Sequence, residues 1–497
     1  MPFRDGSARQ LDAARCVSRN THAQPGQGLG GRILWGAWLL LVAIATIALA
    51  PAAHAIPVFA RQTQQNCVAC HVGGQYPELT PYGRYFKMTG FTQGAPQITP
   101  DGWGIPIAMS LQVGVNRMSN NTADGNPAAP KGTPIDLRNG QLAPDQASLY
   151  AGGRIADNVG VFAQYTFAWD QGNRSAGTLG ADNFDLRYAD HFWLGTRDVV
   201  VGVSLNNDPG VTDTFNSTPA WAYPWQYSAS GSATSPPVQT ALEAAYGGGT
   251  ARGINAYVYY DKTYYAEVGS YQATSGWTNF LTFTSDNTVP GHNGSTPLIG
   301  ANPYYRLAYT TEWGPSNLML GAFGMRSRIG DGTGDGLNTV YNDRGLDAQY
   351  QYISDPHVVS AQVRYINESI SDPNNLVYAS SPASLRSFYA KAMYVYRAKY
   401  GVALGYWSEQ GSSDANFASG TSGANLFSCL NAPACTTGSP NTKVWIPAIF
   451  WQPLQNLRFT VYRTFFTQFL GGKDNYDGYG RNASGNNSTY LYMWVDF

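Results

Sequence analysis

From about residue 105 to the end of the chain, apolar and polar positions alternate with a period of two. In residues 489–497 the odd positions from Leu491 to Phe497 are apolar, whereas the even positions hold Tyr, Trp and Asp. Period two is the period of a β-strand, whose successive side chains point to opposite faces. An apolar outer face with a polar inner face is typical of a transmembrane barrel, and a soluble β-sandwich is the alternative.

Sixteen segments of the chain follow this alternation. That number exceeds what a single sandwich holds, and the chain ends in Phe497 on an alternating strand, as outer-membrane barrels commonly do. The predicted fold class is therefore all-β, a transmembrane outer-membrane β-barrel of about 16 antiparallel strands. The predicted strands are 105–117, 147–156, 158–169, 183–194, 197–206, 251–261, 263–273, 303–313, 316–327, 344–353, 357–368, 386–397, 399–409, 443–452, 455–468 and 489–497.

The connections between these strands alternate between long and short. The short ones include Gly195-Thr196, Lys262 and Gly314-Pro315, and the long ones include 118–146 and 207–250. Long outer loops and short periplasmic turns are expected of an outer-membrane barrel with an even number of strands. The apolar stretch 238–247 would break this order as a further strand, so we assign it to the loop or to the strand that follows.

An apolar run lies near the start of the chain. Residues 33–50 are apolar, Arg32 precedes them, and Ala53-His54-Ala55 follows. A basic residue, an apolar stretch and a small-x-small site predict a secretory signal peptide, which we place at 1–55 with cleavage after Ala55. A single membrane anchor is the alternative.

The motif Cys67-Val-Ala-Cys70-His71 follows the predicted cleavage site. Two thiols at this spacing can form thioethers to both vinyl groups of one haem, and the adjacent His reaches the iron. A redox C-x-x-C would need a βαβ context, and a zinc site would need two further ligands at matching spacing. The motif therefore predicts one covalent haem c, with His71 as the proximal ligand.

The sixth iron ligand is left open by the sequence. Met88 lies 17 residues after His71 within the same short segment, and a Met ligand would raise the haem potential. An ordinary apolar contact is the alternative role for Met88. Met109 or a histidine of the barrel are other candidate ligands.

Two further cysteines, Cys429 and Cys435, lie in a stretch rich in Gly and Ser. In an exported protein, a local disulfide is the expected state of such a pair.

Composition restricts the function classes. Only 13% of the residues are charged and the net charge is −1, whereas a nucleic-acid binder shows a basic surplus. The hydrophobic share of 43% is too ordinary for a bundle of membrane helices.

The mature chain thus divides into a haem segment, 56–104, and a barrel, 105–497. A segment of fewer than about 50 residues hardly folds alone, and a 16-stranded barrel leaves an aqueous lumen. We therefore expect the segment to plug or cap the lumen. Inward-facing Arg306, Arg364 and Lys391 are expected to contact it or the haem propionates.

The haem segment also resembles a known family. The blocks are Phe59-Ala-Arg-Gln-Thr, Cys67-x-x-Cys-His, Pro77-Glu-Leu-Thr-Pro and Gly83-Arg-x-Phe-Lys, set between a signal peptide and a porin-like region. They resemble the fused monohaem cytochrome–porin family, whose best-known members are outer-membrane iron-oxidising cytochromes. The position of Met88 is often another apolar residue in that family.

The resemblance implies an oxidoreductase of the outer membrane. It would oxidise extracellular Fe(II) and pass the electron to a periplasmic c-type cytochrome or blue-copper protein. Cys67, Cys70 and His71 would hold the haem, and Arg61, Arg84 and Lys87 fit packing or steering of a propionate, with solvation as the alternative. Two other functions remain open: a haem conduit for another donor or acceptor, and a solute porin with a structural haem.

Overall fold

The structure is a computed structural model. It describes residues 58–74, 77–95, 98–99, 102–103, 106–122, 139–169, 177–217, 236–244, 251–281, 298–330, 338–373, 375, 381–414 and 438–497. All of them belong to one compact unit, His54–Phe497. The predicted signal peptide, Cys429 and Cys435 lie outside the described residues.

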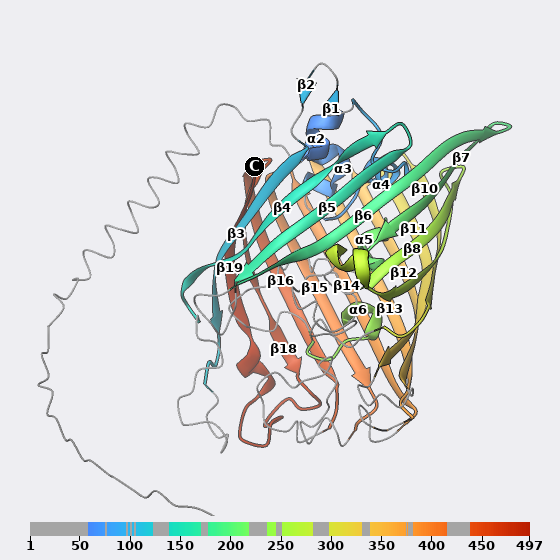
Figure 1. The fold of residues 1–497 in the computed structure, drawn as a ribbon. Helices are drawn as coiled ribbons and strands as arrows, with labels where there is room; N and C mark the ends of the chain where they lie inside the picture. Colours follow the sequence, from blue (N-terminus) through green and yellow to red (C-terminus); the bar gives the residue numbers. More distant parts are fainter. Residues whose placement is uncertain are drawn as a thin grey trace, which may run out of the picture. The chain divides into compact units, whose positions relative to one another are not determined.

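Antiparallel strands close into a barrel (Figure 1). β17 and β18 are two halves of one strand interrupted at Thr464, since both pair with β16, so the described part of the barrel has sixteen strands. All sixteen predicted strands are confirmed. Their bounds are β3 Ile107–Met118, β4 Leu142–Ala156, β5 Val159–Trp169, β6 Gly177–Leu194, β7 Arg197–Asn206, β8 Ala251–Tyr260, β9 Tyr264–Ala273, β10 Asn302–Trp313, β11 Ser316–Gly330, β12 Asn338–Ile353, β13 His357–Ser371, β14 Ala383–Tyr396, β15 Tyr400–Gly411, β16 Thr442–Leu454, β17 Leu457–Arg463, β18 Phe465–Gln468 and β19 Ser488–Asp496.

The alternation of the sequence becomes an inner and an outer face of the wall. On β19, Tyr490 and Tyr492 are buried inside the barrel, whereas Leu491 is 49% exposed on the outside. β13 and β14 show the same alternation along most of their length. Ring closure pairs the edge strands, so the wall has no free edge, and its outer face carries the apolar residues that a bilayer requires.

One end of the barrel carries the short turns. Asp261-Lys262 joins β8 to β9, and Arg397-Ala398 lies between β14 and β15. Each of these four residues has a positive φ, from 50° to 53°. Two consecutive residues in this conformation match the tight hairpin turn whose twist fits that of the strands. We call this end, which holds turns 195–196, 261–263, 314–315, 354–356, 397–399 and 455–456, the short-turn end.

Within the described residues, three helices and a 3-10 turn precede the barrel: α2 Val58–Thr63, α3 Cys67–Cys70, η1 Val72–Gly74 and α4 Pro81–Met88. The Oγ1 of Thr80 accepts a hydrogen bond from the Gly83 N–H at 3.1 Å, so α4 has a side-chain N-cap followed by proline. A two-stranded pair, β1 Ile98–Thr99 and β2 Gly102–Trp103, leads to β3. No helix of the described chain is long and apolar enough to cross a membrane.

The described residues 58–74 and 77–95, which we call the helical segment, contact inward-facing side chains of the wall. Gln351 of β12 donates to the Leu79 carbonyl at 3.0 Å, and the Tyr257 hydroxyl of β8 donates to the Met88 carbonyl at 2.6 Å. Lys391 of β14 forms an ion pair with Glu78. The expected contact of Lys391 with this segment is therefore present.

The connection between β7 and β8 supplies a second layer against the inner wall. Its described parts, 207–217 and 236–244, include α5 Pro209–Thr212 and α6 Ala241–Ala244, and we call them the lumen segment. The expectation that this whole connection forms an outer loop was wrong, because both parts bond to inward-facing groups. Arg306 and Arg364 bind here, to Asp213 and Glu243 respectively, rather than to the haem segment.

An arginine on the outer face at mid-wall is expected to destabilise the barrel. Val363 lies near the middle of β13 and faces outward. In lipid bilayers, Val363→Arg should lower the free energy of unfolding by about 2–4 kcal/mol, because the guanidinium would face hydrocarbon. The matched variant Thr467→Arg, at the far end of β18 from the short turns, should cost about 0–1 kcal/mol. Equal costs in a urea titration of the two variants would contradict a lipid-facing outer wall.

Candidate functional site

The C-x-x-C-H motif occupies one helical turn and the residue after it. Cys67 and Cys70 are the first and last residues of α3, so their thiols lie one turn apart. His71 leaves the helix in an extended conformation, with φ −115° and ψ 135°, and its N–H donates to the Cys67 carbonyl at 2.8 Å. Neither described cysteine forms a disulfide. Both thiols and the imidazole are thus held on one short element.

α4 fixes this turn from the other side. The Thr80 N–H donates to the Cys70 carbonyl at 2.9 Å, and the Thr80 hydroxyl donates to the Ala69 carbonyl at 2.6 Å. The approach of the two helices needs a glycine, because a Cβ on Gly83 would lie 2.2 Å from the Cys70 carbonyl oxygen. Gly83 therefore sets how closely α4 packs on the motif.

Cys67, Cys70 and His71 all line one cavity. Its unfilled space is about 1380 Å³, counting the part open to solvent. Phe59, which stacks on Phe91 at 5.2 Å between ring centroids, belongs to the same lining. Further apolar lining residues come from α2, α4, the barrel wall and α5 of the lumen segment; they include Val58, Ala60, Phe86, Ala108, Phe162, Val211 and Trp494.

This combination fits a haem c. The cavity is apolar, the two thiols are spaced for thioethers, and the imidazole stands beside them. Burial lowers the pKa of the His71 imidazole to about 4, although a hydrogen bond to the Glu78 backbone opposes the shift. The ring is therefore neutral around pH 7, which is the form that coordinates a metal. Burial, with a smaller effect from Cys67, raises the pKa of the Cys70 thiol to about 11.

Two of the three basic residues proposed beside the haem point to the barrel wall. Arg61 donates to the Ile107 carbonyl of β3. Arg84 donates to Gln349 of β12 and, at 3.5 Å, to Asn317 of β11. Neither residue lines the cavity, so the structure gives them a docking role. Burial lowers the pKa of the Arg84 guanidinium to about 10, which leaves it charged.

Lys87 does line the cavity, and it also joins the two inner layers. Its ammonium group donates to the carbonyls of Val211 and Asp213 in the lumen segment, the latter at 3.1 Å. Burial and the nearby Arg187 guanidinium lower the pKa of Lys87 to about 8.

The candidate distal ligand Met88 is placed elsewhere. Its side chain is buried in a cluster with Tyr257, Tyr265 and Met319, and it is not part of the cavity lining. The structure therefore favours the alternative role of Met88, an apolar contact with the wall. Met109 of β3 borders the cavity. The described barrel histidines, His191 and His357, contact Asp198 and Tyr394 and do not line it.

Sequence reasoning missed the residues that anchor the segment to the wall. Glu78 is 1% exposed, pairs with Lys391 and accepts from the Ser360 hydroxyl at 2.7 Å. Gln62 donates to the carbonyls of Phe91 and Gln93 at 2.6 and 2.7 Å, which holds the two ends of the helical segment together. Its Oε1 accepts from the Arg154 N–H of β4 at 3.0 Å, which ties the segment to the wall. The only sequence signal was an acid within the apolar block Pro77-Glu-Leu-Thr-Pro.

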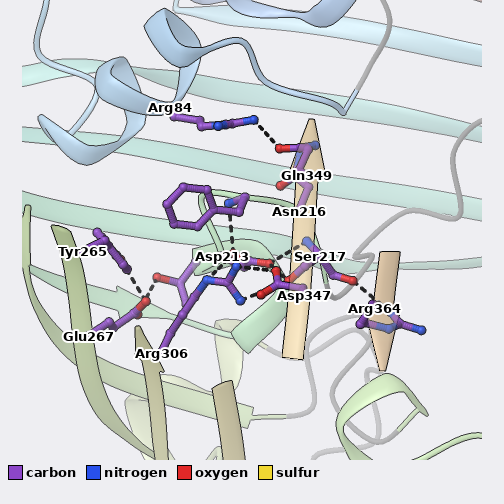
Figure 2. A network of polar contacts seen from close by, with 12 residues as sticks. Arg84, Asp213, Asn216, Ser217, Tyr265, Glu267, Arg306, Asp347, Gln349 and Arg364 are labelled. Atoms are coloured by element: carbon purple, nitrogen blue, oxygen red, sulfur yellow. Dashed lines mark hydrogen bonds and ion pairs between the residues drawn. The ribbon is translucent and has the colours of Figure 1, made fainter. Parts of the chain in front are cut away.

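Polar contacts also fix the lumen segment, as Figure 2 shows. Arg306 lies between Asp213 at 3.2 Å and Asp347 at 2.7 Å, and it donates to the Ser217 hydroxyl at 3.0 Å. Arg364 donates to the Ser217 carbonyl at 3.0 Å. These guanidiniums are almost fully buried, and such groups are stable only when paired in this way.

No protein-family model matches the chain, and no curated protein matches it. Several solved outer-membrane structures are similar at low identity. The channel DcaP of Acinetobacter baumannii has 12% identity and a TM-score of 0.43, over 79% of this chain and 96% of that one. OmpF of Salmonella typhi, in complex with daunomycin, has 12% identity and a TM-score of 0.44, over 79% and 97%. An anion-selective porin from Comamonas acidovorans has 13% identity and a TM-score of 0.41, over 79% and 98%.

A methyl group at position 83 is expected to separate α4 from α3. Gly83→Ala should destabilise the helical segment by about 1–3 kcal/mol, since the new Cβ would overlap the Cys70 carbonyl. Limited proteolysis of the folded protein should then cut within 58–95 faster than in the unchanged protein. Gly485→Ala is the control, because its Cβ would meet no atom closer than 3.5 Å. Equal cleavage of both variants would contradict the packing described.

Proposed function

We propose that this chain is an outer-membrane cytochrome that oxidises extracellular Fe(II) and delivers the electron to a periplasmic c-type cytochrome or blue-copper protein. One observation carries the proposal: Cys67, Cys70 and His71 line a single apolar cavity beside the inner wall of a closed barrel. The resemblance of residues 56–91 to fused cytochrome–porins supports it. Each turnover converts Fe(II) to Fe(III) outside and reduces one carrier inside.

Different residues of the chain would attach the haem, coordinate its iron and line its cavity. When bound, haem c supplies a centre that takes up and releases a single electron. Cys67 and Cys70 would hold it covalently, and neutral His71 would be its iron ligand. Phe59, Phe86 and other rings of the lining would shield it from water on the side of the helices.

The position of the cavity suits transfer to a periplasmic carrier. β3 begins at the short-turn end, and the helical segment precedes it in the chain, with the short β1–β2 pair between them. Short turns face the periplasm in outer-membrane barrels, and long loops face outward. A carrier would then reach the motif from the periplasm, near exposed Gln65 and Asn66 of the cavity rim.

The inner layers suit electron transfer without iron uptake. The helical segment and the lumen segment both bind to the wall, through Glu78–Lys391 and Arg306–Asp213 among other pairs. Lys87 connects the two layers. Such an arrangement would keep Fe(III), which is the product, outside the cell.

Reduction by Fe(II) tests the proposal. Purified protein in detergent, mixed with Fe(II) without oxygen from acid to neutral pH, should show a rapid rise of the haem α-band. The double variant Cys67→Ser/Cys70→Ser should carry no covalent haem on a denaturing gel and show no such signal. A loaded protein that dithionite reduces fully and Fe(II) does not reduce would exclude Fe(II) as donor, leaving a conduit for another partner.

A solute porin with a structural haem is the second candidate, favoured by the closed barrel of sixteen strands, a size that leaves a channel in porins. Ion conductance distinguishes the two functions. In planar bilayers we expect no open-channel steps from the intact protein, because the helical segment and the lumen segment are both bound to the inner face of the barrel. Steady porin-like conductance would favour the solute porin.

A further inference from the structure

Two acidic side chains face each other on the inner wall beside the lumen segment. Asp343 of β12 and Glu368 of β13 are direct cross-strand partners and are 2% and 0% exposed. Directly opposed residues on neighbouring strands project to the same face, so the two side chains lie beside each other on the inner wall. Neither Asp343 Oδ1 nor Glu368 Oε1 has a hydrogen-bond donor from another residue of the described chain. Two carboxylates have only acceptor atoms, so neither acid can donate a hydrogen bond to the other unless one of them carries a proton.

The other oxygen of each acid holds α6. The Ala241 N–H donates to Glu368 Oε2 at 2.6 Å, and the Leu242 N–H donates to Asp343 Oδ2 at 2.9 Å. Consecutive backbone groups of the lumen segment are thus bound by the two members of one acid pair. We call Asp343 and Glu368 the acid clamp.

The charged groups around the acid clamp do not supply a counter-charge for it. Arg364 of β13 is already paired with Glu243 of α6, which also accepts from the Ser387 hydroxyl of β14 at 2.7 Å. Other buried charged groups on β12 to β15 have partners of their own. Glu409 accepts from the Trp407 indole at 2.7 Å, and Asp372 accepts from the Thr339 hydroxyl at 3.4 Å. Lys391 is paired with Glu78, and Asp347 is paired with Arg306.

We propose that the acid clamp is a buried proton-binding site and that its single shared proton fixes α6 to the barrel wall. Two like charges in contact in a buried site cannot both ionise without strong repulsion. The proton removes this repulsion and supplies the missing donor between Asp343 and Glu368. The site is built from wall and lumen-segment residues alone, so it does not depend on haem or on Fe(II).

The attachment of α6 to the wall depends on pH through the proton of the acid clamp. While the proton is bound, both N–H groups of α6 keep their acceptors without repulsion in the clamp. As the pH rises and the proton leaves, a second negative charge appears beside the first, with Glu243 and Glu409 nearby. The attachment of α6 should therefore be tightest in acid and weaken with rising pH.

Hydrogen exchange of the full-length, haem-loaded protein in detergent tests the site directly. The probe is the protection of the Ala241 and Leu242 amides, corrected for the intrinsic pH dependence of exchange. In the unchanged protein, protection should fall on the order of tenfold or more from acid to alkaline pH. In Asp343→Asn it should become independent of pH, because the Asn amide donates permanently to Glu368 while its oxygen accepts from Leu242.

Glu368→Gln provides the same replacement from the other strand and covers the case in which one variant does not fold. Asp474→Asn, which removes an exposed carboxylate in the connection before β19, should keep the pH profile of the unchanged protein. The proposal is overturned if the unchanged protein shows pH-independent protection, or if the folded Asn or Gln variant loses protection as the unchanged protein does.

Discussion

A closed barrel of sixteen strands encloses more space than the side chains of its own wall can fill, and its inner face is polar. Arg187, Arg306 and Arg364 are each almost fully buried on that face. Buried guanidiniums need acidic or carbonyl partners, since an unpaired buried charge costs several kcal/mol. The rest of the structure follows from this constraint, because the wall supplies only some of these partners and chain segments that fold against the inner wall supply the others.

Two segments supply these partners. The helical segment brings Glu78 to Lys391, and the lumen segment brings Asp213 to Arg306. Packing against the wall also gives the helical segment the apolar surface that a short peptide lacks. The helical segment and the barrel therefore both line the cavity beside the C-x-x-C-H motif. Phe59 and Phe86 come from the helices, and Phe162 and Trp494 come from the barrel. The candidate haem site exists only in the assembled barrel.

The packing of α4 between the wall and the lumen segment explains why the residues of this helix that were proposed beside the haem point in different directions. Arg84 lies on α4 at a site that faces β11 and β12, so it docks the helix rather than facing the cavity. Met88, one turn later, packs on the tyrosines of β8 and β9. Lys87 lies between them in sequence but points toward the lumen segment. Along one helical turn, the direction of each side chain decides its role.

The amino-acid pattern alone predicted the strands, their number and the position of the C-x-x-C-H motif. Period-two alternation reports the two faces of a strand wherever one faces lipid and the other does not, so even the interrupted strand at 455–468 was recognised. Cys67, Cys70 and His71 could be selected as candidate haem ligands because the haem attachment that they predict requires a fixed local spacing.

Which chain segments lie inside the barrel became clear from the three-dimensional contacts. No local period encodes the pairs that join different strands or segments, which are Glu78–Lys391, Arg306–Asp213 and the cross-strand partners Asp343 and Glu368. The connection 207–250 looked like an outer loop because its polar composition suits solvent and a polar lumen equally. Long-range pairing of buried charges, which sequence spacing does not reveal, placed its described parts against the inner wall.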